Sequence, residues 1–376
     1  MVSIDPTIST TVIYASLFAT LCLGLTLTYL TTKVPNFAHT DFTTLGFYTT
    51  FTLYWLAGME TYATIPFSFV AGGVFAVVMY VAILRPLSRR GSGIVPQMIA
   101  TLAVDIAFVG IIGAYTDYLN AKYLALLGPA GFNPYTVFAF HDISILGLGQ
   151  SIVIIAPVAA ALVGFGLYIL LTRTRFGVAM RASIENPSLA KIVGINVERV
   201  YVVSWFIAGG IAGMSGTLWG VAFGGTTDLS RLLIVAVFAG SILGGLTNLY
   251  GAIVGGLIVG ASENFLTTWL TQVVGYQFGS ITGSGVLAFQ RGIPLAIMIV
   301  TLMFIPQGVV SADWGRARKS VAVKAAALVG AAFMFGLAAV FESEVGFGLI
   351  TNGAIALGVV SLLFLVGLTI PWRRGR

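Results

Sequence analysis

Long apolar runs constrain this chain more than any other feature. A helix needs about 20 predominantly apolar residues to cross the ~30 Å hydrocarbon core of a bilayer. The sequence predicts eleven such spans, at residues 11–31, 37–57, 64–84, 94–115, 145–171, 200–223, 231–247, 249–271, 291–310, 321–341 and 347–370. Long strands that alternate apolar and polar residues do not occur, so a bundle of helices is the spanning structure that fits. We therefore expect an all-α polytopic membrane protein.

The composition agrees with this prediction and excludes other classes. Charged residues make up 9% of the 376 residues and hydrophobic residues 58%, whereas soluble domains carry roughly 25% charged residues. Such a sequence excludes a soluble enzyme, a disordered regulator and a nucleic-acid-binding protein. We expect the lipid bilayer as its surroundings, no nucleic acid as a partner, and a multi-pass location in the cell (cytoplasmic) membrane.

The distribution of basic residues predicts the orientation. If the N-terminus lies outside, 16 of the 19 lysines and arginines fall on one side, and only Lys122, Arg231 and Arg291 fall on the other. Because basic residues accumulate in cytoplasmic loops, this bias predicts an N-outside, C-inside chain. An odd number of spans is consistent with that arrangement.

Two parts of the chain depart from a simple row of spans. The run 231–247 is short and is broken by Gly244, Gly245 and Asn248, so it is either a full span or a half-helix or re-entrant segment. A half-helix is tolerated only where protein or a water-filled cavity surrounds it. Residues 313–376 are expected to add two C-terminal transmembrane helices.

The longest basic cytoplasmic stretch, 172–199, predicts a short docking helix. Asn186 followed by Pro187 is typical of a helix start, and Gly194 suits a left-handed stop. Leu189, Ile192 and Val193 then share one apolar face. Two turns are too few to be stable alone, so this helix docks either on the protein's own loops or in a groove of a cytosolic partner.

The residues before this helix add charge to the same stretch. Arg181 and Glu185 are four residues apart, a spacing at which opposite charges can pair on a helix. We expect that pair on the turn before the docking helix.

The same stretch resembles the cytoplasmic signature of branched-chain amino-acid ABC transporter permeases of the LivH type. The resemblance covers residues 11–312. It rests on residues 174–196 and on further stretches: Asn36-Phe-Ala-His39 with Asp41, Arg85-Pro-Leu, 240–256 and Pro306-Gln-Gly308.

The resemblance implies a permease domain over 1–312 whose segment 172–199 contacts an ATPase. By resemblance, Arg181, Glu185, Ala190 and Gly194 take part in this coupling together with Asn186, Pro187, Leu189 and Ile192. It also implies a second permease subunit, two ABC ATPase subunits and an extracytoplasmic substrate-binding protein. The cargo would be amino acids, branched-chain by resemblance, while related permeases that carry urea or short amides share the signature.

The sequence lacks the residues for catalysis. It contains no Gly-Lys dipeptide and hence no phosphate-binding P-loop, so another subunit must hydrolyse any ATP. With two histidines and one cysteine, a zinc-type metal site is not expected. We expect no enzyme activity, no metal and no cofactor in this chain.

Several polar residues fall within or beside the predicted spans. Ionisable residues there usually face a bundle interior or a water-filled path. They serve either as hydrogen-bonded anchors between helices or as the lining of a translocation path, and an ion-coupled secondary transporter using Asp105 and Glu263 is an alternative. The candidate residues are Asn36, His39 and Asp41 at the start of the second span near the cytoplasmic side, Asp105 in the fourth span, and Glu263 and Asn264 in the eighth.

Glycines spaced one helical turn apart predict close helix packing. These pairs are more typical of packing within one chain than of a dimer face. They are Gly209 and Gly213, Gly216 and Gly220, Gly251 and Gly255, and Gly256 and Gly260.

Overall fold

The computed structural model describes residues 6–127, 137–143, 151–278, 290, 292–305 and 308–310. Within these ranges the chain is helical, no strand occurs, and one isolated β-bridge joins Phe138 to Gly225. The two predicted spans at 321–341 and 347–370, and the whole of 313–376, lie outside the described residues.

Six helical stretches are long and apolar enough to cross a membrane, so the chain is a polytopic membrane protein. Four short elements join into one of these stretches: η2 (Thr61–Thr64), α3 (Ile65–Met79), η3 (Tyr80–Leu84) and α4 (Arg85–Arg89). The other five spans lie in α1 (Pro6–Thr32), α5 (Ile94–Leu127), α6 (Ile152–Arg173), α9 (Val197–Ala222) and α11 (Leu249–Phe278).

Three predicted spans are shorter in the structure than the sequence indicated. They are α2 (Asp41–Phe51) continued by η1 (Thr52–Leu56), α10 (Leu229–Gly244) and α13 (Gly292–Phe304). At a rise of 1.5 Å per residue, the 16 residues of α10 extend about 24 Å, less than a ~30 Å core. Of the nine predicted spans that fall on described residues, six therefore meet the length of a full span. Hydropathy alone does not indicate where a helix begins or ends inside the protein.

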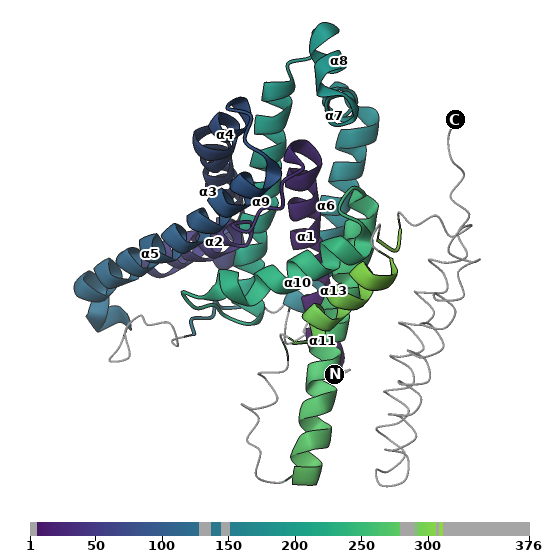
Figure 1. Ribbon diagram of the computed structural model, residues 1–376. Coiled ribbons are helices and arrows are strands. Elements are labelled where there is room, and N and C mark those ends of the chain that lie inside the picture. The colour runs from purple at the N-terminus through teal and green to yellow at the C-terminus, as the bar shows by residue number, and fades with distance from the viewer. Residues whose placement is uncertain are drawn as a thin grey trace.

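The centre of the bundle is α1, which lies between α6, α9, α10 and α11 (Figure 1). Its side chains are buried on every side, with Phe18, Leu21, Cys22 and Leu25 fully covered. A helix that is apolar all round is expected in such a central position. The other helices are arranged around it, and α5 leans away from the bundle (Figure 1).

Small residues allow the backbones of α2, α3 and α9 to approach closely. A Cβ atom added to Gly46 of α2 would collide with the backbone of Gly213, and one added to Gly72 of α3 would collide with the backbone of Gly209. The predicted glycine pairs on α9 and α11 likewise face other helices of the same chain. The expectation of packing within one chain is confirmed.

Three short helices gather at one end of the molecule. These are α7 (Arg175–Glu185) and α8 (Pro187–Ile192), which connect the end of α6 to the start of α9, and α4, which lies beside the start of α9 (Figure 1). This end contains the segment that the sequence singled out for docking.

Candidate functional site

The first element of the docking segment, α7, is anchored on the bundle. Its N-cap Thr174 accepts a hydrogen bond of 3.1 Å from the Gly177 amide, which satisfies one otherwise free N–H of the first turn. Met180 is buried among residues of α1, α6 and α9. The expected Arg181–Glu185 pair does not form: the Arg181 guanidinium donates to the carbonyl oxygen of Leu171 at the end of α6, and Glu185 is exposed.

The second element, α8, begins and ends as the sequence predicted. The side chain of Asn186 accepts a hydrogen bond of 3.0 Å from the Leu189 amide, and Pro187 takes the first helical position. Gly194 follows with a φ of 85°, a left-handed conformation that favours glycine. The chain then reverses direction, and the Ile195 amide donates a hydrogen bond of 2.9 Å to the Ala190 carbonyl oxygen.

The apolar face of α8 is open. Leu189, Ile192 and Val193 are 56%, 81% and 65% exposed. Ala190 is 2% exposed, so its methyl group packs against its own chain. The apolar face therefore does not pack on the protein's own described loops, which was the first of the two docking alternatives.

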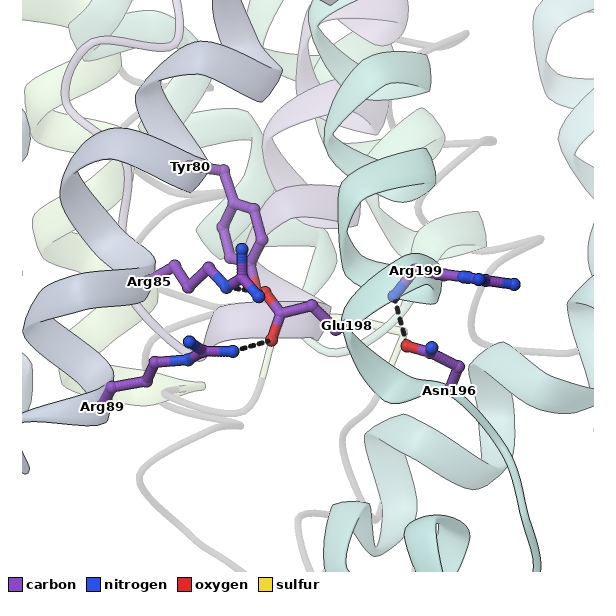
Figure 2. Close-up of polar contacts among 6 residues, drawn as sticks. All are labelled: Tyr80, Arg85, Arg89, Asn196, Glu198 and Arg199. Carbon is purple, nitrogen blue, oxygen red and sulfur yellow. Dashed lines mark hydrogen bonds and ion pairs between the residues drawn. The ribbon is translucent and has the colours of Figure 1, made fainter.

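A cluster of charges links the start of α9 to α4, at the same end of the molecule (Figure 2). One carboxylate oxygen of Glu198 lies 2.6 Å from Arg85 Nε, and the other lies 3.5 Å from Arg89 Nη2. Tyr80 donates a 3.3 Å hydrogen bond to the same carboxylate. We call Glu198, Arg85, Arg89 and Tyr80 the Glu198 cluster.

The Glu198 cluster is directly connected to the docking segment. Asn196, two residues before Glu198, caps α9 by accepting a 3.0 Å hydrogen bond from the Arg199 amide (Figure 2). The chain between α8 and Glu198 is thus only a few residues long and tightly hydrogen-bonded. Sequence reasoning did not find Glu198. Its only signal was an acidic residue in a first helical turn, which is also a common helix-stabilising feature.

The segment that joins α1 to α2 enters the interior of the bundle. His39 Nε2 is 3.1 Å from the carbonyl oxygen of Leu21, which lies eleven residues, or about 17 Å, before the end of α1. Asn36, His39 and Asp41 are all fully buried. α2 therefore begins inside the bundle, level with the middle of α1 and not with its end, because the residues before it are held there by hydrogen bonds to neighbouring helices. Their place near the cytoplasmic side stays a prediction.

Those bonds come from two further helices. The Phe37 amide donates to Thr101 Oγ1 of α5 at 3.1 Å, and Thr40 Oγ1 donates to the Ser230 carbonyl of α10 at 3.0 Å. Asp105 is half-buried on α5, one turn beyond Thr101, and lies beside Asp41.

Glu263 and Asn264 form a separate group on α11. Asn264 Oδ1 accepts a hydrogen bond of 2.9 Å from Thr11 of α1, which fits the anchoring role. Glu263 is buried near Tyr14 and Gln290. Among the described residues no hydrogen bond or ion pair joins Glu263 to Asp41 or Asp105, so the structure does not bring the two predicted acids of the secondary-transporter alternative into one site.

Comparison with known proteins identifies the family of this chain. The family model described as "Branched-chain amino acid transport system / permease component" matches residues 7–302. A Methanocaldococcus jannaschii protein named "Probable branched-chain amino acid transport permease protein LivH" is 39% identical over 308 residues, which are 82% of this chain and 93% of that protein.

Two bacterial proteins are more distant relatives. BraD of Pseudomonas aeruginosa is 26% identical and LivH of Escherichia coli is 25% identical, each over 304 residues that cover 78% of this chain and 91% of the relative. Both are named as high-affinity branched-chain amino acid transport system permease proteins. With a family match over most of its length and a relative at 39% identity, the chain belongs to the permease components of branched-chain amino acid transport systems.

Proposed function

We propose that this chain is the membrane-spanning permease subunit of an ABC importer for branched-chain amino acids, driven by ATP that separate subunits hydrolyse. The observation that carries this proposal is the short helix α8, which exposes Leu189, Ile192 and Val193 on a chain of the permease family. Apolar side chains on an aqueous surface indicate a binding partner, and an amphipathic helix in a groove is a common way to bind one.

The proposed assembly contains a second permease subunit, two ABC ATPase subunits and an extracytoplasmic substrate-binding protein. The proposed chain has a permease domain over 1–312 and two further helices in 313–376, with the N-terminus outside and the C-terminus inside. Of its eleven predicted membrane segments, α2 with η1, α10 and α13 are shorter than a full span. Motion of an ATPase subunit would enter through α7 and α8. It would reach α9 through the Asn196 cap and α4 through the Glu198 cluster.

The test is a change of the exposed face of α8. We expect Leu189→Asp to weaken capture of the ATPase subunit roughly tenfold or more, because a carboxylate cannot be desolvated in an apolar groove. ATP-dependent leucine uptake by reconstituted vesicles should fall with it. Capture is measured by pull-down with a tagged permease.

Leu189→Met is the matched control, since it keeps an apolar side chain of similar volume and should leave capture and uptake unchanged. Undiminished capture by the aspartate variant would contradict the docking role. Uptake on an ion gradient without nucleotide would favour a secondary transporter, and preferential uptake of urea or a short amide over leucine would reassign the cargo.

A further inference from the structure

Two short helices begin side by side inside the bundle. α2 starts at Asp41 and α10 at Leu229, and the Thr40 hydroxyl bonds to the carbonyl of Ser230. Because His39 is level with Leu21, near the middle of α1, both starts lie far from either end of that helix. Transporters commonly place their substrate sites where such discontinuous helices meet near the middle of the membrane.

The charges at this point are mainly acidic. Asp41 is fully buried, and Asp105 of α5 and the Ser230 side chain lie beside its carboxyl group. Among the described residues, the cation that acts on both carboxyl groups is Arg231, which already pairs with Asp228 at 3.3 Å and is half exposed. The first turns of α2 and α10 add partial positive charge, roughly +0.5 each, so two ionised carboxyl groups would still share an incomplete countercharge.

The buried polar atoms here have places for more hydrogen bonds. Within the described residues, the two carboxyl oxygens of Asp41 have no hydrogen-bond partner of good geometry, and the Ser230 hydroxyl has none either. The same is true of Asn36 Nδ2 and Thr43 Oγ1 on the same segment. Buried polar groups are nearly always hydrogen-bonded, and a buried carboxyl group is costly without a donor or a cation.

We propose that Asp41, Asp105 and Ser230 bind the ammonium group of the amino acid in transit. An alkylammonium has three N–H donors in a tetrahedral arrangement, which three oxygen-bearing side chains from three different helices can accept. A metal cation of the Ca²⁺ or Mg²⁺ type would need six or more oxygen ligands. Because Asp105 is only half-buried, the site reaches from the interior to the loosely packed side of α5. This inference rests on the proposed function, since it names the part of the cargo that the site recognises.

The test measures ligand binding by the purified transporter without its binding protein. The shift in unfolding temperature is titrated with leucine, with 2-hydroxy-4-methylpentanoate, in which a hydroxyl replaces the ammonium, and with NaCl. We expect leucine to stabilise the wild-type transporter and the hydroxy acid not to. Asp41→Asn and Asp105→Asn should raise the half-saturating leucine concentration about tenfold or more, because a charge-assisted hydrogen bond is lost.

Matched controls separate binding from folding. Asp117→Asn makes the same change at an exposed position of α5 and should leave leucine binding unchanged. Asp105→Glu keeps the charge and should retain more affinity than Asp105→Asn. The inference would be overturned if the hydroxy acid stabilised the wild type as strongly as leucine does, if NaCl did so in place of leucine, or if no ligand stabilised it. Asparagine variants that bind leucine normally would also overturn it. ATP-dependent leucine uptake by the wild-type transporter tests the proposed function separately.

Discussion

At the scale of single residues, Glu198 joins two parts of the bundle that are more than one hundred residues apart in sequence. Its carboxylate holds Arg85 and Arg89 on α4, and Tyr80 adds a hydrogen bond from η3. The side chains of Glu198 and Arg85 are about one-third exposed, so the pair contributes little to stability, up to about 1 kcal/mol. Its consequence is geometric, because it joins α4 to the start of α9.

We expect Glu198→Gln to uncouple ATP hydrolysis from uptake while the permease still folds and still captures its ATPase. A change of about 0.5–2 kcal/mol in coupling corresponds to a roughly 2- to 30-fold lower ratio of leucine taken up to ATP hydrolysed. The measurement is that ratio in proteoliposomes. Arg90→Gln, at an exposed arginine beside the cluster, is the control and should keep the ratio. An unchanged ratio in Glu198→Gln would show that the cluster has no part in coupling.

At the scale of helices, backbone contact replaces side-chain packing where α2, α3 and α9 meet. Without a hydrophobic driving force between helices in lipid, close contact between small residues is what holds them together. Three hydroxyl groups support this contact, because Thr50 of α2 lies 2.9 Å from Ser68 of α3 and 2.7 Å from Thr217 of α9. The interface is therefore sensitive to a single added methyl group.

We expect Gly46→Ala to lower the unfolding temperature of the detergent-solubilised protein. The added Cβ would meet the backbone of Gly213, which cannot rotate away, and overpacking of this kind costs about 1–3 kcal/mol. Gly110→Ala is the matched control on α5, where an added Cβ meets nothing within 4 Å. The measurement is the midpoint of thermal unfolding of each variant. Equal midpoints for Gly46→Ala and Gly110→Ala would contradict the close contact.

At the scale of the whole molecule, the short helices α4, α7 and α8 and their basic residues share one end (Figure 1). The excess of Lys and Arg on this side predicts that it faces the cytoplasm. The single native cysteine, Cys22, is fully buried, so added cysteines can be labelled against little background.

We expect a membrane-impermeant thiol reagent to label Lys122→Cys in intact cells, and Arg90→Cys only after the cells are opened. Both side chains are exposed in the structure and lie on opposite sides of the predicted topology. Labelling of Arg90→Cys in intact cells would contradict the predicted orientation and indicate the opposite one. Unmodified protein, with Cys22 alone, should remain unlabelled in both preparations.

The sequence by itself determined the class of the protein and its local elements. Apolar runs and scarce charge require a helical membrane protein, and Asn186, Pro187 and Gly194 set the limits of α8 because capping and left-handed backbone preferences act within a few residues. Tertiary structure decided the rest. Hydropathy could not show that α2 begins inside the bundle, because residues 36–40 are held there by bonds to three other helices. The Phe37 amide bonds to Thr101, the His39 side chain to Leu21 and the Thr40 side chain to Ser230. Hydropathy could not bring Asp105 to Asp41 or Glu198 to Arg85 either, since those pairs depend on long-range packing that no local pattern records.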